Sequence, residues 1–335
     1  QDHPIEELLA REPPSRLPPH PLISVDDRLR LDHAHGQSLP DWVRMRGGML
    51  DRFPDGVAKP TTRQDVDALL QFAAARKIVV IPYGGGTSVA GHLEIYETER
   101  PVLSIALNGL NRLIGIEKTN LLATFEAGIL GPELEKHLNS KGFTLGHFPQ
   151  SFEYSTLGGW IATRSSGQQS RHYGRIEQLF AGGEVFTFKG RLKLPPFPAS
   201  AAGPDIRQLV LGSEGRMGIL TRAIVRISSL PDVNDIHGVF FPDWNHARQA
   251  AQTLAQSQIP LSMVRLSNPQ ETRVSLALAT RNGCRSLPGR LPSPSRMPSS
   301  SISILSPITT IVGPSHAKKC GPPPSAIASR IPCSV

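Results

Sequence analysis

The residues best suited to chemistry are glycines and hydroxyl side chains that follow a short apolar run. In "VVIPYGGGTSVAGH", residues 79–92, the glycines Gly84–Gly86 are followed directly by Thr87 and Ser88. Consecutive glycines expose backbone N–H groups in a concave turn, which can hold phosphate oxygens without bulky side chains in the way. The two hydroxyl groups add donors to the same turn. The stretch therefore predicts a site for phosphate oxygens, with a merely tight loop as the alternative.

Two phosphate-binding motifs are excluded at this turn. No Gly-Lys-Ser/Thr step follows the glycines, so the turn is not a Walker-type loop. The glycine spacing also differs from the Gly-x-Gly-x-x-Gly pattern of dinucleotide-binding Rossmann folds.

Two further stretches have the same glycine-rich character. Residues 149–167, "PQSFEYSTLGGWIATRSSG", surround a Gly-Gly pair with small and hydroxyl side chains. Residues 211–220, "LGSEGRMGIL", form a third glycine-rich turn before a strand. Three such turns in one domain predict a long ligand with diphosphate, sugar and ring portions.

The elements that must position these turns alternate between strands and helices. Residues 56–60 predict a strand, and Thr62 with Asp65 predicts a capping box that starts a helix. That helix leads to a strand at residues 78–82, which ends at the first glycines. Further strands are expected at residues 101–107, 121–128 and 218–229, and a helix at residues 131–142. The fold class is therefore α+β.

Four segments are expected along the chain. Residues 1–52 predict an N-terminal helical extension, and residues 53–232 hold the alternating strands and helices. Residues 233–280 begin a further α+β unit with a strand, a helix and a strand, and lack the rest of a sheet that such a unit needs. Residues 281–335 are rich in Ser and Pro, without aromatic or acidic residues, and predict a disordered basic tail.

The tail accounts for most of the net charge of +8, because it holds seven Lys or Arg residues. Residues 1–280 carry 29 basic and 28 acidic residues, so we expect no nucleic-acid partner. All three cysteines also lie in the tail, at spacings that match neither a zinc site nor a disulfide framework, and no metal site is expected. No apolar run is long enough for a transmembrane helix. The abrupt change of composition favours loss of the natural reading frame near Leu278 over a functional basic tail.

Several motifs together carry a family resemblance. These are "PYGGGTS", "FEAGILGPELEKHL", "GHFPQSFEYSTLGGWIATRSSG", "GPDIRQLVLGSEGRMGIL" and "MVRLSN". In this order they resemble the FAD-binding domain of the vanillyl-alcohol oxidase, or PCMH-type, flavoprotein family. Within that family they are most similar to alkyldihydroxyacetonephosphate (alkylglycerone-phosphate) synthases and their bacterial FAD-linked oxidase relatives. The resemblance runs from about Asp32 to Leu278 and then stops, so a truncated or frame-shifted C-terminal part is expected.

The resemblance implies a PCMH-type FAD-binding domain of two α+β subdomains, followed by the start of an incomplete α+β cap domain. It also implies non-covalent FAD, with the first turn around the diphosphate, the second beside the ribityl and ring portions, and the third at the adenine side or flavin edge. The implied cofactor-binding residues are Pro82, Tyr83, Gly84, Gly85, Gly86, Thr87, Ser88, Gln150, Ser151, Ser155, Thr156, Thr163, Ser166, Glu214, Gly218, Ile219 and Leu220.

One arginine and two histidines are further candidates. Arg265 matches an arginine that the synthases need for activity, and a salt bridge that supports the cap domain is the alternative interpretation. His92 and His147 lie at no motif position that argues for a covalent flavin link. For both histidines we expect hydrogen bonding or solvation.

Three functions remain open on the sequence. The resemblance implies an ether-lipid synthase reaction, in which a fatty alcohol replaces the acyl group of acyl-dihydroxyacetone phosphate. The alternatives are an FAD-dependent oxidase or dehydrogenase of a 2-hydroxy acid, and a non-catalytic FAD-binding fragment. The expected partner is thus a small lipid or hydroxy-acid substrate, and the resemblance allows for peripheral membrane contact and a homodimer. The expected location is cytoplasmic, or peroxisomal for a eukaryotic synthase.

Overall fold

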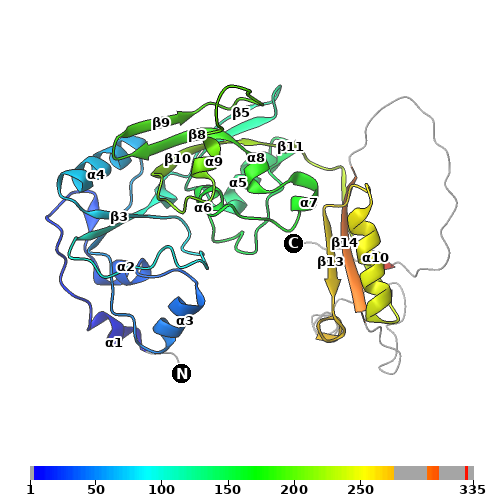
Figure 1. Cartoon of the computed structure of the whole chain (residues 1–335), viewed down its shortest axis with the longest axis horizontal. Coiled ribbons are helices and arrows are strands. Elements are labelled where there is room, and N and C mark those ends of the chain that lie inside the picture. The colour runs from blue at the N-terminus through cyan, green and yellow to red at the C-terminus, as the bar shows by residue number, and fades with distance from the viewer. Residues whose placement is uncertain (1–3, 275–299, 309–328, 331–335) are drawn as a thin grey trace. The chain divides into compact units, whose positions relative to one another are not determined.

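The computed structural model describes residues 4–274, 300–308 and 329–330, shown as coloured ribbon in Figure 1. The chain divides into two compact units. The first comprises residues 1–167 and 174–228, and the second comprises residues 168–173 and 229–335. All three glycine-rich turns belong to the first unit. The candidate site is therefore built within one unit.

The first sheet of this unit carries the first glycine-rich turn. Its strand order is β1-β2-β4-β3, with β2 and β3 both parallel to β4 and β1 antiparallel to β2. The strands are β1 (Ile23–Ser24), β2 (Gly56–Ala58), β3 (Val79–Tyr83) and β4 (Val102–Ala106). Because β3 ends at Tyr83, the chain enters the glycines directly from the edge of the sheet.

Helix α4 (Arg63–Ala75) packs beside this sheet. Its first turn is closed by the predicted capping box, in which Thr62 and Asp65 each accept a backbone N–H of the other. The buried side chains of α4 are Val66, Leu69, Leu70 and Ala73, at the i, i+3, i+4, i+7 spacing of one helical face. Phe186 and Ile219 of a second sheet complete the same hydrophobic core, so α4 joins the two sheets.

The second sheet is antiparallel, with the strand order β5-β6-β10-β8-β9. Its strands are β5 (Leu113–Glu117), β6 (Leu122–Glu126), β8 (Phe180–Thr187), β9 (Gly190–Leu194) and β10 (Ile219–Arg226). Side chains of helices α5 (Gly131–Asn139), α6 (Leu157–Thr163) and α8 (Ile176–Leu179) pack into one core with this sheet. Trp160 of α6 is 2% exposed, which fixes the helix that carries the second glycine-rich turn.

Shorter elements complete the first unit. Short helices occur within residues 1–52, where the helical extension was expected. A small core at this end of the unit is formed by Leu8, Leu31, Ala34, Leu50 and Phe53. The remaining elements are helices α1 (Ile5–Leu9), α2 (Asp27–Asp32), α3 (Leu39–Arg46) and α9 (Arg207–Val210), the 3-10 helix η1 (Leu107–Gly109) and strand β7 (Phe143–Thr144). The short strand β11 (Ser228–Ser229) lies at the boundary between the units.

The second unit is an antiparallel sheet with the strand order β13-β14-β12-β15. It comprises β12 (Val233–Phe241), β13 (Met263–Ser267), β14 (Ser300–Ile308), β15 (Ser329–Arg330) and the helices α10 (Trp244–Gln256) and α7 (Ser170–Tyr173). The predicted strand, helix and strand of residues 233–280 are thus present, and β14 lies between the two strands.

The segments β14 and β15 differ from the predicted disordered tail, because the structure pairs both with β12. In "SSISILSPI", Ile302 and Ile304 alternate with serines, a period-two pattern that suits a strand. The average composition of residues 281–335 hides this short pattern. The rest of the predicted tail, including all three cysteines, lies outside the described residues, so its disorder stays a prediction.

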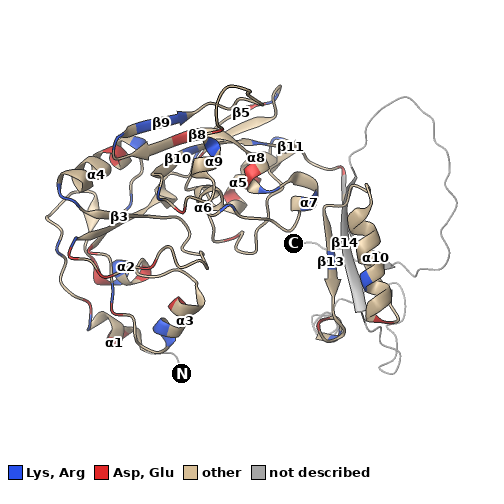
Figure 2. Ribbon diagram, in the orientation of Figure 1, with Lys and Arg blue, Asp and Glu red and all other residues tan. Residues whose placement is uncertain are grey.

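Charges of both signs are interspersed over the first unit, as Figure 2 shows. This distribution agrees with the near balance of basic and acidic residues in residues 1–280. Among the described residues, no helix is both long and apolar enough to cross a membrane. The described residues also hold no group of three or more His, Cys, Asp or Glu side chains placed to bind a metal ion.

Candidate cofactor-binding site

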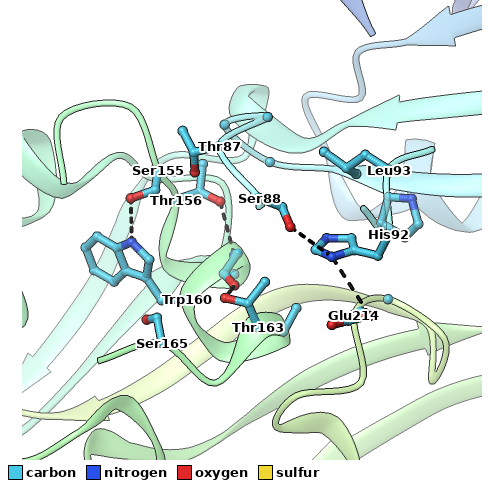
Figure 3. Close-up of a pocket in the computed structure, with 18 of the residues that line it drawn as sticks. Thr87, Ser88, His92, Leu93, Ser155, Thr156, Trp160, Thr163, Ser165 and Glu214 are labelled. Atoms are coloured by element: carbon cyan, nitrogen blue, oxygen red, sulfur yellow. Dashed lines mark hydrogen bonds and ion pairs between the residues drawn. The ribbon is translucent and has the colours of Figure 1, made fainter. Parts of the chain in front are cut away.

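The three glycine-rich turns line one cavity of about 330 Å³ in the first unit (Figure 3). Thirteen of the predicted cofactor-binding residues lie in its wall. They are Pro82, Gly84, Gly85, Gly86, Thr87, Ser88, Ser151, Ser155, Thr156, Thr163, Glu214, Gly218 and Leu220. Segments that are far apart in the sequence therefore meet around one space, as the long-ligand prediction requires.

Four predicted residues lie outside this cavity wall. Tyr83 follows Pro82 in β3 and points to the other side, where its hydroxyl donates to the Asp32 carbonyl at 3.1 Å. Ile219 is buried in the core beside α4, because neighbouring strand residues face opposite sides. Gln150 and Ser166 have exposed side chains.

The glycines of the first turn are required first of all by contact with the second turn. A Cβ atom on Gly85 would lie 1.7 Å from the Tyr154 carbonyl oxygen, and one on Gly84 would lie 2.6 Å from Thr156 Oγ1. Gly86 has a φ of +69°, which favours glycine. The first turn therefore combines a tight loop with a ligand-facing surface, and the two interpretations of its glycines are compatible.

The hydroxyl groups of the second turn hold its shape as well as lining the cavity. Thr156 is the N-cap of α6, and its Oγ1 accepts the Gly159 N–H at 3.1 Å. Ser155 Oγ donates to the Ser151 carbonyl and accepts the Trp160 Nε1–H, both at 2.7 Å. Thr163 Oγ1 donates to the Gly159 carbonyl at 2.8 Å. These bonds fix the hydroxyl oxygens in place before a ligand arrives.

The third turn has positive φ angles, which residues other than glycine rarely adopt. Gly212, Gly215 and Gly218 have φ values of +74°, +82° and +125°, and Glu214 has a φ of +52°. A non-glycine residue in the left-handed region is uncommon and occurs often at functional sites. Gly215 also packs against the first turn, since a Cβ there would lie 3.0 Å from Pro82 Cγ.

His92 connects the first and third turns at the cavity wall, and it makes the kind of hydrogen bond that was expected of it. Its Nδ1 lies 3.0 Å from Ser88 Oγ and 3.9 Å from Glu214 Oε2. Burial is the main cause that lowers the pKa of His92, the Arg216 charge lowers it further, and the Glu214 charge opposes the shift. The ring is therefore mostly neutral at neutral pH.

His147 lies behind the cavity wall and is fully buried. Its Nε2 lies 2.8 Å from Ser165 Oγ, which lines the cavity, and its ring centroid lies 5.1 Å from that of Trp160. Burial lowers the pKa of His147 to about 4, so this ring is neutral at neutral pH. Its contacts are those of a residue that positions the second turn.

Several residues of the cavity wall were not predicted to bind the cofactor. They include Leu93, Leu107, Gly158, Gly159, Trp160, Val210 and Ser213, and also His92, for which only hydrogen bonding or solvation was expected. The Gly-Gly pair and Ser213 stand inside the second and third glycine-rich stretches, so local composition was a usable signal for them. Leu107 and Val210 come from separate elements, and only the tertiary fold brings them to the cavity.

Arg265, the predicted catalytic residue, lies on β13 in the second unit. Its guanidinium forms an ion pair with Glu271, and its side chain is 60% exposed. Arg265 thus has the ion-pair partner that the salt-bridge interpretation requires. Its catalytic role stays a prediction.

The cavity wall suits a ligand with phosphate, sugar and ring portions. It contains eight hydroxyl side chains and seven glycines, which offer hydrogen-bond donors and close backbone approach. Leu93, Leu107, Trp160 and Val210 add apolar surface for a flat ring. The residues present therefore fit FAD, and the first and second turns would hold it.

Comparisons with known proteins identify the same cofactor. Residues 54–193 match the family described as FAD binding domain. The chain is 39% identical over 259 residues to the alkyldihydroxyacetonephosphate synthase of Dictyostelium discoideum, across 77% of this chain and 42% of that protein. A solved alkyldihydroxyacetonephosphate synthase structure matches with a TM-score of 0.76 at 33% identity, across 88% of this chain and 57% of that one.

A weaker match connects the chain to a subunit of a glycolate oxidase. It is 27% identical over 224 residues to the glycolate oxidase subunit GlcD of Bacillus subtilis, across 64% of this chain and 46% of that protein. The chain spans less than half the length of these curated relatives.

The cavity, the matched domain and the synthase relatives agree on cofactor and family. FAD is the cofactor of this α+β fold. The chain is a homologue of the alkyldihydroxyacetonephosphate synthases, built on a PCMH-type FAD binding domain.

Proposed function

We propose that this chain is the FAD-binding part of an enzyme that acts like an alkyldihydroxyacetonephosphate synthase. Such an enzyme exchanges the acyl group of acyl-dihydroxyacetone phosphate for a fatty alcohol and forms an ether lipid precursor. The observation that carries the proposal is the 39% identity to a synthase over 259 residues, against 27% to the oxidase subunit. The substrate is accordingly a small lipid.

The division of labour follows from the cavity. FAD, when bound, supplies the ring chemistry of the exchange, and the protein supplies position and electrostatics. Pro82–Ser88 would hold the diphosphate, and the second turn with Ser155, Thr156 and Thr163 would lie beside the ribityl and ring portions. The buried Trp160 and the hydrogen bonds of the second turn keep this wall rigid.

The first experiment is an absorbance spectrum of the purified chain before and after denaturation. Flavin bands that pass into the soluble fraction on unfolding are expected for non-covalent FAD. A protein that stays colourless after incubation with FAD would contradict the cofactor-binding part of the proposal.

The second experiment separates the synthase from its alternatives. The flavin-loaded protein is incubated with acyl-dihydroxyacetone phosphate and a labelled fatty alcohol, and labelled ether product supports the synthase proposal. Flavin bleaching by glycolate or D-lactate without exchange favours the oxidase. Bound flavin with neither reaction supports the non-catalytic FAD-binding fragment and contradicts a synthase activity of this chain.

A further inference from the structure

The wall of the FAD cavity has few charged side chains for a site that would hold a diphosphate. His92 and Glu214 are the titratable residues of the wall, and none of the wall residues that the structure describes is a lysine or arginine. A diphosphate is dianionic, and the cavity already contains the Glu214 carboxylate. The anion therefore enters a partly buried space in which a charge of the same sign is already present.

His92 is placed to offset both negative groups. Its side chain is 14% exposed, and Nδ1 faces Ser88 Oγ at 3.0 Å and Glu214 Oε2 at 3.9 Å (Figure 3). Ser88 belongs to the turn that would hold the diphosphate, and Glu214 belongs to the turn with the disfavoured backbone. One imidazole ring thus links the anion-binding turn to the carboxylate.

Other charged or titratable side chains near His92 line a neighbouring hollow. Arg216, Glu94 and Tyr96 line this hollow together with His92 and Glu214. Glu94 forms an ion pair with Arg44, so its charge is offset there. Arg216 disfavours a proton on His92 and Glu214 favours one, while burial favours the neutral ring. An added anion in the FAD cavity shifts this balance toward the imidazolium.

We propose that His92 takes up one proton from solvent when FAD binds, and that the resulting imidazolium is the positive charge of the diphosphate site. The neutral ring carries one N–H and the imidazolium carries two, so Nδ1–H then donates toward Ser88 or Glu214. Binding of FAD and of the proton are coupled. FAD affinity consequently rises as the pH falls, by up to about tenfold per pH unit where uptake is complete.

The test is calorimetric titration of the FAD-free protein with FAD, near pH 6.5 and 7.5, in buffers of different ionisation enthalpy. The dependence of the observed heat on the buffer gives the number of protons taken up. We expect a net uptake of protons, of up to one per FAD bound, for the wild-type protein. Binding of FAD without proton uptake would overturn the role of His92 and leave the FAD site intact. Absence of FAD binding would contradict the FAD assignment and this inference with it.

Two variants and a control test whether His92 is the group that takes up the proton. His92→Gln keeps hydrogen-bonding capacity without titration, so the uptake should vanish and the pH dependence of affinity should flatten. His137→Gln, at an exposed histidine of α5 in the same unit, is the matched control and should behave as wild type. Glu214→Gln removes the like charge and should tighten FAD binding above pH 7. Uptake that persists in a folded His92→Gln protein would contradict the proposal.

The wild-type protein provides a readout that needs no variant to fold. In protein with ¹³C-labelled histidine, one ring resonance should change from the neutral to the charged chemical shift when FAD is added near pH 6.5. Histidine resonances that all keep their protonation state on FAD binding would contradict the proposal.

Discussion

At the scale of single residues, the glycines of the first turn are explained by contact inside the protein as much as by a ligand. An aspartate at Gly85 would place a carboxylate near the expected diphosphate, and the structure shows that even a methyl group does not fit there. Substitution of Gly85 is therefore opposed by steric overlap as well as by charge repulsion.

Gly85→Ala should lose flavin and lower the melting temperature, because its Cβ would lie 1.7 Å from the Tyr154 carbonyl oxygen. We expect a loss of about 1–3 kcal/mol or more in the free energy of unfolding, the usual range for overpacking. Flavin content and thermal unfolding measure the effect. Gly115→Ala is the matched control, since a Cβ there meets nothing within 4 Å. Normal flavin content in Gly85→Ala would contradict the described contact.

His147 should make stability depend on pH. Its folded pKa of about 4 lies below the ordinary value of 6.5, so between these pH values the unfolded chain binds a proton that the folded chain does not. Its effect is absent above about pH 6.5 and reaches on the order of 3 kcal/mol of destabilisation as the pH falls to about 4.

Urea unfolding of wild type and His147→Gln at pH 7.5, 6.5, 5.5 and 4.5 measures this contribution. The difference between the two proteins removes the effects of other titrating groups. The stability of wild type should fall more steeply than that of the variant below about pH 6.5. Parallel curves would show that His147 titrates alike in the folded and unfolded states.

At the scale of elements, helix α6 carries the second turn and depends on its cap. Thr156 accepts the Gly159 N–H, and its hydroxyl also lies where a Cβ atom on Gly84 would point. Thr156→Ala should cost about 1 kcal/mol of stability, as loss of an N-cap hydroxyl usually does, and should weaken FAD binding. Thr156→Ser keeps the hydroxyl and should recover most of the stability. Thermal unfolding and an FAD titration compare the two, and equal losses in both variants would show that the methyl group, not the cap, matters.

At the scale of the whole molecule, the two units should respond differently to truncation. All residues of the cavity wall belong to the first unit, whereas β14 is the strand between β12 and β13 in the second. Removal of residues 281–335 should leave flavin content unchanged and make the second unit more susceptible to protease. Removal of residues 309–335 keeps β14 and is the control.

Limited proteolysis followed by mass spectrometry measures this difference. Equal protection of the second unit in both truncated proteins would contradict the pairing of β14. A loss of flavin in either protein would show that the cavity depends on residues outside the first unit.

The sequence by itself determined the local elements and the turns of the first unit. The capping box at Thr62 and Asp65, the apolar face of α4 and the glycine-rich stretches depend on neighbours within a few residues, so they can be read from spacing. The motif order also predicted FAD. The period-two pattern of β14 is equally local, but the average composition of the whole tail hides it.

Only the tertiary structure decided which residues share the cavity and what charge they carry. Tyr83 and Ile219 stand next to wall residues and face the other way, because side chains alternate along a strand. Gly85 meets Tyr154, and His92 meets Glu214, across separations that no local pattern encodes. These contacts arise when two sheets and α6 bring three turns together, and protonation follows from the burial and charge that this assembly creates.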